Sequence, residues 1–142
     1  MKRAHLLVLS FALALFLGAC GGGDDKSVEK LGGSWVLDLN ATIENNESMK
    51  NSIPAGEAGD MARGMLEAML GSMTLTFDVK AKTFSGSLMG ETIENKAFEV
   101  VSVKGDDFEI KIDGETAPFT LKGDELRMKG PDGAVLVFQR KK

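Results

Sequence analysis

The fold class follows from the stretch Phe108-Glu109-Ile110-Lys111-Ile112-Asp113-Gly114-Glu115-Thr116-Ala117-Pro118-Phe119-Thr120-Leu121. Apolar and polar residues alternate on both sides of Asp113-Gly114, as they do in strands that are buried on one face. Asp-Gly is a preferred pair in the two-residue turns that join antiparallel strands. The stretch therefore predicts a β-hairpin with one apolar face.

The same alternation extends over most of the chain. Turns rich in Gly and Asp separate further runs of this kind at residues 34–39, 73–79, 84–88, 98–103, 126–129 and 135–140. The alternation changes phase at Val100-Val101, which predicts a β-bulge or a sheet corner. Short turns make consecutive strands antiparallel neighbours. We expect a mainly β fold, an up-and-down antiparallel meander of about eight strands. Closure into a barrel would remove its exposed edges; an open or partly closed sheet is the alternative.

The long connection between the first two strands, residues 40–72, contains a predicted helix. Its apolar residues recur at helical spacing and fall on one stripe: Ala58, Met61, Ala62, Met65, Leu66, Met69 and Leu70. Gly71 follows, where a helix commonly ends. Gly59 and Gly64 each weaken the helix by ~1 kcal/mol relative to Ala, so it must pack against the rest of the protein. We expect residues 56–70 to form a lid over the barrel, with Met61, Met65 and Met69 facing the interior.

Composition excludes several classes of function. The chain has 142 residues, with one His (His5), one Cys (Cys20) and no Tyr. Once residues 1–19 are removed as a signal peptide, the remaining chain has 15 basic and 21 acidic side chains, a net charge of −6. Nucleic-acid binding favours a basic face instead. Without His or a free Cys, the remainder lacks the parts of a Ser-His-Asp or Cys-His site and the soft ligands of a zinc site. We expect a protein that is not an enzyme, with no cofactor, metal or nucleic-acid partner.

The N-terminus carries an export signal. Lys2 and Arg3 precede an apolar run of 12 residues from Leu6 to Leu17, interrupted only by Ser10. This length fits the ~7–15 residues of a signal-peptide core and falls short of the ~18 or more that span a bilayer. The run ends in Leu17-Gly18-Ala19-Cys20, which resembles the lipobox of bacterial lipoproteins.

That resemblance implies a lipid on the Cys20 thiol and cleavage of the chain before it. Residues 1–19 are then a lipoprotein signal peptide, residues 20–30 a flexible tether and residues 31–142 the folded domain. The membrane becomes a partner through the lipid anchor, since two or more acyl chains on one terminus anchor a protein stably. Gly21 is not the Asp that signals inner-membrane retention in enteric lipoprotein sorting. We expect the mature protein to lie in the bacterial cell envelope, at the outer membrane and facing the periplasm.

The predicted barrel resembles lipocalins and their relatives. Gly33-Ser34-Trp35 on the first strand is similar to the Gly-x-Trp opening of lipocalins, and Arg140 on the last strand to the Arg that packs over that Trp. A helical insert between the first two strands is similar to that of fatty-acid-binding proteins. The resemblance implies a lipocalin-like closed barrel in which the Arg140 guanidinium lies within ~6 Å of the Trp35 ring.

The apolar faces of the strands would line the barrel, and two functions remain open. The first is binding of a small apolar ligand, such as a lipid or fatty acid, by residues of the interior and the lid: Trp35, Met61, Met65, Met69, Phe77, Phe84, Phe98, Phe108, Phe119 and Phe138. The second is a non-enzymatic scaffold or protein-interaction lipoprotein with a filled barrel and an unidentified protein partner, because small barrels can be filled by their own side chains. An apolar cavity of roughly 300 Å³ or more would favour the first.

A hydrolase would need two converging carboxylates, and no such pair stands out.

Replacement of Cys20 tests the anchor. The Cys20→Ser chain has no thiol to acylate, so we expect it to be soluble or to remain uncleaved. Membrane fractionation and the mass of the N-terminal peptide measure this outcome. A variant that is cleaved and still partitions into membranes as the parent does would show that the anchor lies elsewhere.

Overall fold

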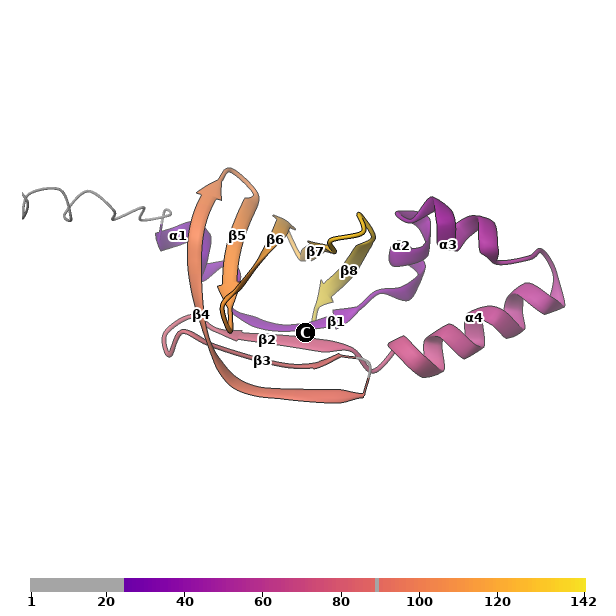
Figure 1. The fold of residues 1–142 in the computed structure, drawn as a ribbon, viewed down its shortest axis with the longest axis horizontal. Helices are drawn as coiled ribbons and strands as arrows, with labels where there is room; N and C mark the ends of the chain where they lie inside the picture. The colour runs from indigo at the N-terminus through magenta and orange to yellow at the C-terminus, as the bar shows by residue number, and fades with distance from the viewer. Residues whose placement is uncertain (1–24, 89) are drawn as a thin grey trace, which may run out of the picture.

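Eight strands form a closed antiparallel barrel in the part of the chain that the structure describes, residues 25–88 and 90–142 of a computed structural model. Each strand pairs with the next along the chain, and the last pairs with the first (Figure 1). The strands are β1 (Gly33–Leu37), β2 (Thr74–Asp78), β3 (Thr83–Leu88), β4 (Glu91–Lys104), β5 (Asp107–Ile112), β6 (Glu115–Lys122), β7 (Glu125–Lys129) and β8 (Val135–Arg140). The predicted up-and-down meander and its closure are confirmed. Cys20 and the predicted signal peptide lie outside the described residues.

The helices differ in number from the prediction. The chain forms α1 (Asp25–Glu29) before the barrel and, between β1 and β2, the three helices α2 (Leu39–Glu44), α3 (Glu47–Ser52) and α4 (Glu57–Leu70), where one was expected. Leu39, predicted to end the first strand, begins α2 instead because Asp38 caps that helix by accepting a hydrogen bond from the Ala41 N–H at 3.0 Å. Residues 38–71 form what we call the helical arm, which lies at the opposite end of the molecule from α1 (Figure 1).

The turns and bulges have the chemistry that the sequence indicated. Asp113 (φ 53°) and Gly114 (φ 88°) both have positive φ, as the turn of a two-residue hairpin requires. The register between β4 and β5 shifts between Val100 and Ser102, which confirms the predicted bulge. A second shift, between Phe84 and Gly86 in the pairing of β3 with β4, was not predicted.

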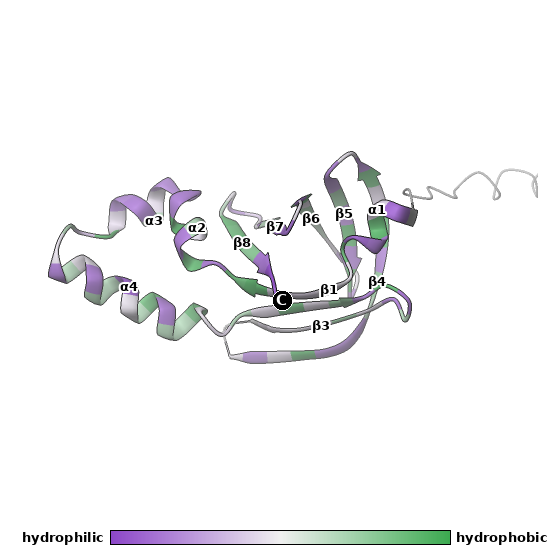
Figure 2. Ribbon diagram, turned by 180° about the vertical axis from the view of Figure 1, so that it is seen from behind, coloured by the Kyte–Doolittle hydropathy of each residue, from purple (hydrophilic) through white to green (hydrophobic). Residues whose placement is uncertain are grey.

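Aromatic side chains pack against one another in the core of the barrel. The ring of Phe77 lies 5.0 Å from that of Phe84, 5.4 Å from that of Phe98 and 5.9 Å from that of Phe119, measured between centroids. Tilted and edge-to-face contacts at these distances are favourable. Hydrophobic and hydrophilic residues interleave along the strands (Figure 2). The inward half of this alternation builds the core.

Arg140 and Trp35 join the two ends of the sheet. The guanidinium carbon of Arg140 lies 4.2 Å from the centre of the Trp35 ring, which confirms the predicted pairing. The same guanidinium donates hydrogen bonds to the carbonyl oxygens of Lys30 (2.6 Å) and Gly32 (2.8 Å) and to the Asp124 carboxylate (3.0 Å). One side chain thus ties the segment before β1 to the end of β8.

Truncation of Arg140 tests this closure. Arg140→Ala removes the contact with Trp35 and leaves two carbonyl groups without their donor, so we expect the free energy of unfolding to fall by about 2–4 kcal/mol. Lys96→Ala is the matched control, since the ion pair of Lys96 with Asp113 is exposed and contributes ~0–1 kcal/mol. Urea unfolding measures both variants. Equal losses in the two would refute a special role for Arg140.

Candidate functional site

The structure gathers the predicted interior residues in one buried cluster. Their side chains are 0–6% exposed: Trp35, Phe77, Phe84, Phe98, Phe108, Phe119 and Phe138. They pack against one another and against aliphatic side chains such as Leu75, Ile110 and Leu126. The strand alternation therefore identified the core of the barrel correctly.

The expected lid orientation is wrong. Met61 is 72% exposed, and Met65 and Met69 are each 64% exposed. The side of α4 that faces the protein carries Gly59, Ala62, Leu66 and Leu70 instead. A Cβ atom on Gly59 would lie 1.9 Å from the Pro54 carbonyl oxygen, so this side must face the loop that leads into the helix.

The reason for this error is that apolar residues surround most of α4. At 100° per residue, Leu66 and Met65 belong to neighbouring parts of one wide apolar arc. Periodicity shows that such an arc exists, but it does not show which half of the arc is buried. The close approach at Gly59 makes that choice, and the sequence gives no sign of the Pro54 carbonyl group on that side.

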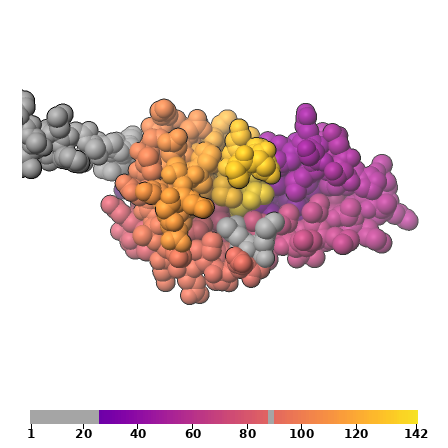
Figure 3. All heavy atoms as spheres, in the orientation of Figure 1, coloured from indigo at the N-terminus to yellow at the C-terminus, as the bar shows by residue number. Residues whose placement is uncertain are grey.

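An exposed apolar surface results, which we call the Met face: Ala58, Met61, Gly64, Met65, Ala68 and Met69, all exposed. Three of the four large hydrophobic side chains exposed in the described part of the chain belong to it; the fourth is Val101 at the bulge of β4. Figure 3 shows α4 standing out from the barrel at one end of the molecule. Clustered exposed apolar groups of this kind mark interaction surfaces more often than scattered ones do.

Asn46 and Thr42 fix the helical arm to the barrel. The Asn46 amide donates to the Val135 carbonyl oxygen at 2.7 Å and accepts from the Val135 N–H at 2.8 Å. Thr42 Oγ1 accepts from the Val137 N–H at 3.0 Å. These side chains take the place of a strand beyond Leu37, where β1 ends. The sequence around Asn46 did not indicate this contact, because side-chain pairing with a distant strand leaves no local pattern.

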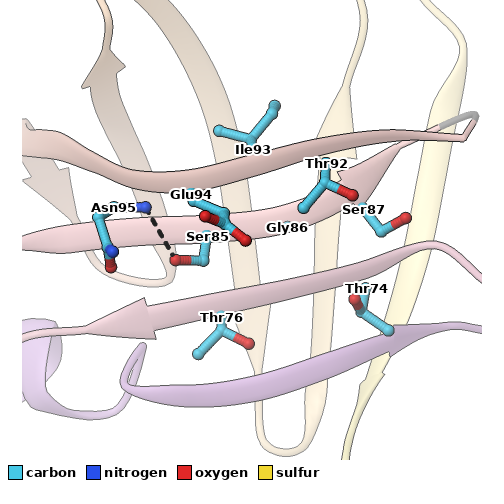
Figure 4. A pocket seen from close by; sticks show the side chains of 9 residues that line it. All are labelled: Thr74, Thr76, Ser85, Gly86, Ser87, Thr92, Ile93, Glu94 and Asn95. Carbon is cyan, nitrogen blue, oxygen red and sulfur yellow. Dashed lines mark hydrogen bonds between the residues drawn. The ribbon is translucent and has the colours of Figure 1, made fainter.

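A polar hollow of ≈420 Å³ lies on the outer face of the sheet (Figure 4). Its lining is rich in hydroxyl groups: Thr74, Thr76, Ser85, Gly86, Ser87, Thr92, Ile93, Glu94 and Asn95. Ser85 accepts a hydrogen bond from the Asn95 N–H at 3.1 Å. Glu94 is the one carboxylate of this lining, whereas glycoside hydrolysis uses two. The arrangement offers hydrogen bonds but no paired acid and base.

A second hollow, of ≈370 Å³, lies between the end of β1 and α4. Its lining mixes apolar and charged groups: Val36, Leu37, Asp38, Leu39, Asn40, Arg63, Glu67, Gly71 and Gln139. Within residues 25–88 and 90–142, no three His, Cys, Asp or Glu side chains gather as a metal site would require. The helices described there are also too short or too polar to cross a bilayer.

Comparison with known proteins supports the fold and does not extend to a function. No known family model matches the sequence, and no curated protein matches it significantly. The crystal structure of a DUF4847 family protein from Bacteroides vulgatus is similar, with a TM-score of 0.50 at 13% sequence identity. The match covers 79% of this chain and 94% of that one. At this identity the likeness concerns the β-barrel fold alone.

Two neighbouring residues of α4 test which side of the helix is buried. Leu70 is 6% exposed and packs in the core, so Leu70→Ala should lower the free energy of unfolding by about 2–5 kcal/mol. Met69→Ala should change it by less than ~0.5 kcal/mol, as is usual for exposed positions. Denaturant unfolding of both variants measures the difference. A loss at Met69 as large as that at Leu70 would mean that the Met face is buried.

Proposed function

We propose that this chain is a lipid-anchored lipoprotein of the bacterial envelope, not an enzyme, whose filled barrel is a scaffold that binds another protein. The contact of the Phe77 ring with three other aromatic rings inside the barrel carries this proposal. A carrier of lipids or fatty acids needs an apolar cavity of roughly 300–1,000 Å³ in the same place. The interior residues pack against one another in that place, and neither of the two hollows described above is lined by the aromatic core.

The positions of the hollows also favour a scaffold over a carrier. The hollow at Thr74 and Thr76 opens on the outer face of the sheet and is polar. The hollow at Arg63 and Glu67 lies beside α4 and is lined in part by charged groups. Neither provides the mainly apolar lining that a fatty acid would need. Met61, Met65 and Met69, expected to close over a ligand, point into solvent.

The surface chemistry supports a binding role rather than catalysis. The described residues contain no His or Cys, and the outer hollow has one carboxylate in its lining. Acid–base and nucleophilic catalysis most often use a His, a Cys or a pair of carboxylates held within hydrogen-bond reach of a partner group. Protein binding needs only an exposed surface of suitable shape and chemistry, and the Met face is such a surface.

The location follows from the lipobox resemblance at Cys20. The helix α1 begins at Asp25, which lies five residues after Cys20 in the sequence. A chain of that length spans at most ~18 Å when fully extended. The anchor would therefore hold the α1 end of the barrel near the membrane, and Gly21 favours the outer membrane with the barrel in the periplasm.

Ligand content tests the scaffold against the carrier. We expect the soluble chain of residues 21–142 to be free of lipid by native mass spectrometry and to take up no fluorescent fatty acid. Phe77→Ala serves as the control, because it opens a cavity in the same core and should cost about 3–5 kcal/mol of stability. A lipid bound one-to-one to the unmodified chain would refute the filled scaffold and restore the carrier.

A further inference from the structure

We infer that the Met face of α4 binds an apolar groove rimmed by Lys and Arg side chains on a second envelope protein. This inference rests on the proposed function and names the surface and the chemistry of the partner. Charged and apolar residues occupy different sides of α4. Asp60, Arg63 and Glu67 form one narrow charged stripe, and a single further charge, Glu57, lies at the helix start. A helix that is apolar over most of its circumference is normally covered on most of it, yet the described residues cover only the side of Leu66 and Leu70.

The methionines of the Met face are regularly spaced along the helix. Met61, Met65 and Met69 are spaced four residues apart, so successive side chains are separated by ~6 Å along one side of the helix. Recognition of a helix by a groove uses anchors at this spacing. Methionine side chains are flexible and adapt to irregular apolar surfaces. The Met face therefore has the shape and the side chains of a groove-binding helix.

Gly64 provides an independent observation in the middle of the same face. Gly in a helix costs ~1 kcal/mol relative to Ala. A Cβ on Gly59 would collide with the Pro54 carbonyl oxygen, which explains that glycine, but a Cβ on Gly64 would meet no atom of the described residues within 4 Å beyond the helix's own backbone. Packing within the protein thus gives no reason for Gly64. Close approach of a partner at Gly64 and Ala68 gives one.

The helical arm is acidic. The helical arm, residues 38–71, contains six acidic and two basic residues, a net charge of −4, whereas residues 72–142 have a net charge of only −1. Asp60 and Glu67 lie beside the Met face on α4, on the side away from Ala62. Complementary charge at the rim of an interface selects partners and speeds association. The rim of the groove that receives α4 should therefore be basic.

A membrane surface fits these observations less well. Helices that lie in the membrane interface carry basic residues on their polar side, because the lipids there are often anionic. In α4, one basic residue, Arg63, stands against Glu57, Asp60 and Glu67. The helical arm also lies at the far end of the barrel from α1, which leads to the proposed anchor (Figure 1).

A second copy of the chain also fits less well. A two-fold axis places the same surface of both copies in contact. When two copies of α4 pair in antiparallel fashion, the flank that carries Asp60 and Glu67 faces the same flank of the other copy. Like charges opposed in this way repel. A basic partner relieves that repulsion, whereas self-association creates it.

Site-specific photo-crosslinking in the native envelope tests the inference. A benzophenone amino acid is placed at Met65 of the full-length lipidated protein in its own cells, and at Lys111, exposed on β5, as the control position. We expect a protein adduct from position 65 and none from position 111. Mass spectrometry of the adduct should locate it in an apolar groove of the partner that is bordered by Lys or Arg residues.

Charge reversal supplies the second arm of the experiment. The double variant Asp60→Lys/Glu67→Lys should lower the adduct yield from position 65 at least about fivefold, because it opposes basic charges across the rim. Glu109→Lys/Glu115→Lys, which changes the net charge equally on the barrel, should leave the yield within about twofold. Circular dichroism and membrane fractionation establish that the variants fold and remain anchored.

Several outcomes would overturn the inference. They are a lipid adduct, an adduct between two copies of the chain, an adduct on a surface without basic residues, no adduct, or equal effects of the two charge-reversal variants. A protein adduct from Lys111 alone would reject the Met face while leaving a protein-binding scaffold intact. Fatty-acid uptake by the soluble chain would instead reject the scaffold, so the two failures are distinguishable.

Discussion

The guanidinium of Arg140, 4.2 Å from the ring of Trp35, holds the first and last strands of the barrel together. β1 and β8 share only three residue pairs, between Trp35 and Arg140, Val36 and Gln139, and Leu37 and Phe138. So short a seam has few backbone hydrogen bonds of its own. A stacked, hydrogen-bonded guanidinium adds contacts that do not require longer strands. Gly33, with φ 116°, gives the chain the turn into β1 and leaves room for the Arg140 side chain.

The short seam also explains why the helical arm belongs to the barrel. The Asp38 N–H still donates to the Val137 carbonyl oxygen at 2.8 Å, but beyond it the Val137 N–H and the backbone groups of Val135 have no strand partner on that edge of β8, and unpaired backbone groups that are buried are costly. Asn46 and Thr42 pair with those groups in place of a longer β1. The arm thus completes the closure through α2, while α4 extends outward from it. Because the arm is fixed to the barrel at α2, α4 is held in place and still exposes its Met face.

Local patterns predicted the parts of the fold that depend on local physics. The strand alternation, the Asp113-Gly114 turn and the bulge near Val101 follow from side-chain periodicity and backbone preferences, and all are present. The pairing of Trp35 with Arg140 followed from a resemblance rather than from a pattern. The role of Asn46 could not be predicted, because its partner, Val135, is distant in sequence. The orientation of the Met face could not be predicted either, because a wide apolar arc fits two rotations of the helix and a single carbonyl contact decides between them.

Several features of α4 lower its own stability. Its N-cap residue, Gly56, makes no side-chain capping bond, and Gly64 lies in its exposed face. The backbone of Gly56 requires glycine, because its φ of 78° is one that residues with a side chain rarely adopt. Gly64 has no such reason, and Ala there would stabilise the helix by about 1 kcal/mol. Violations of local preference that nothing in the fold requires are concentrated at functional surfaces. Barrel glycines such as Gly105 and Gly123, by contrast, lie at turns with positive φ, and a Cβ on Gly86 in β3 would lie 2.8 Å from the Thr74 carbonyl oxygen. The glycines of the barrel suit its backbone geometry, whereas Gly64 on the exposed side of α4 lowers the stability of the helix. This difference supports the proposal of a barrel scaffold that presents the Met face.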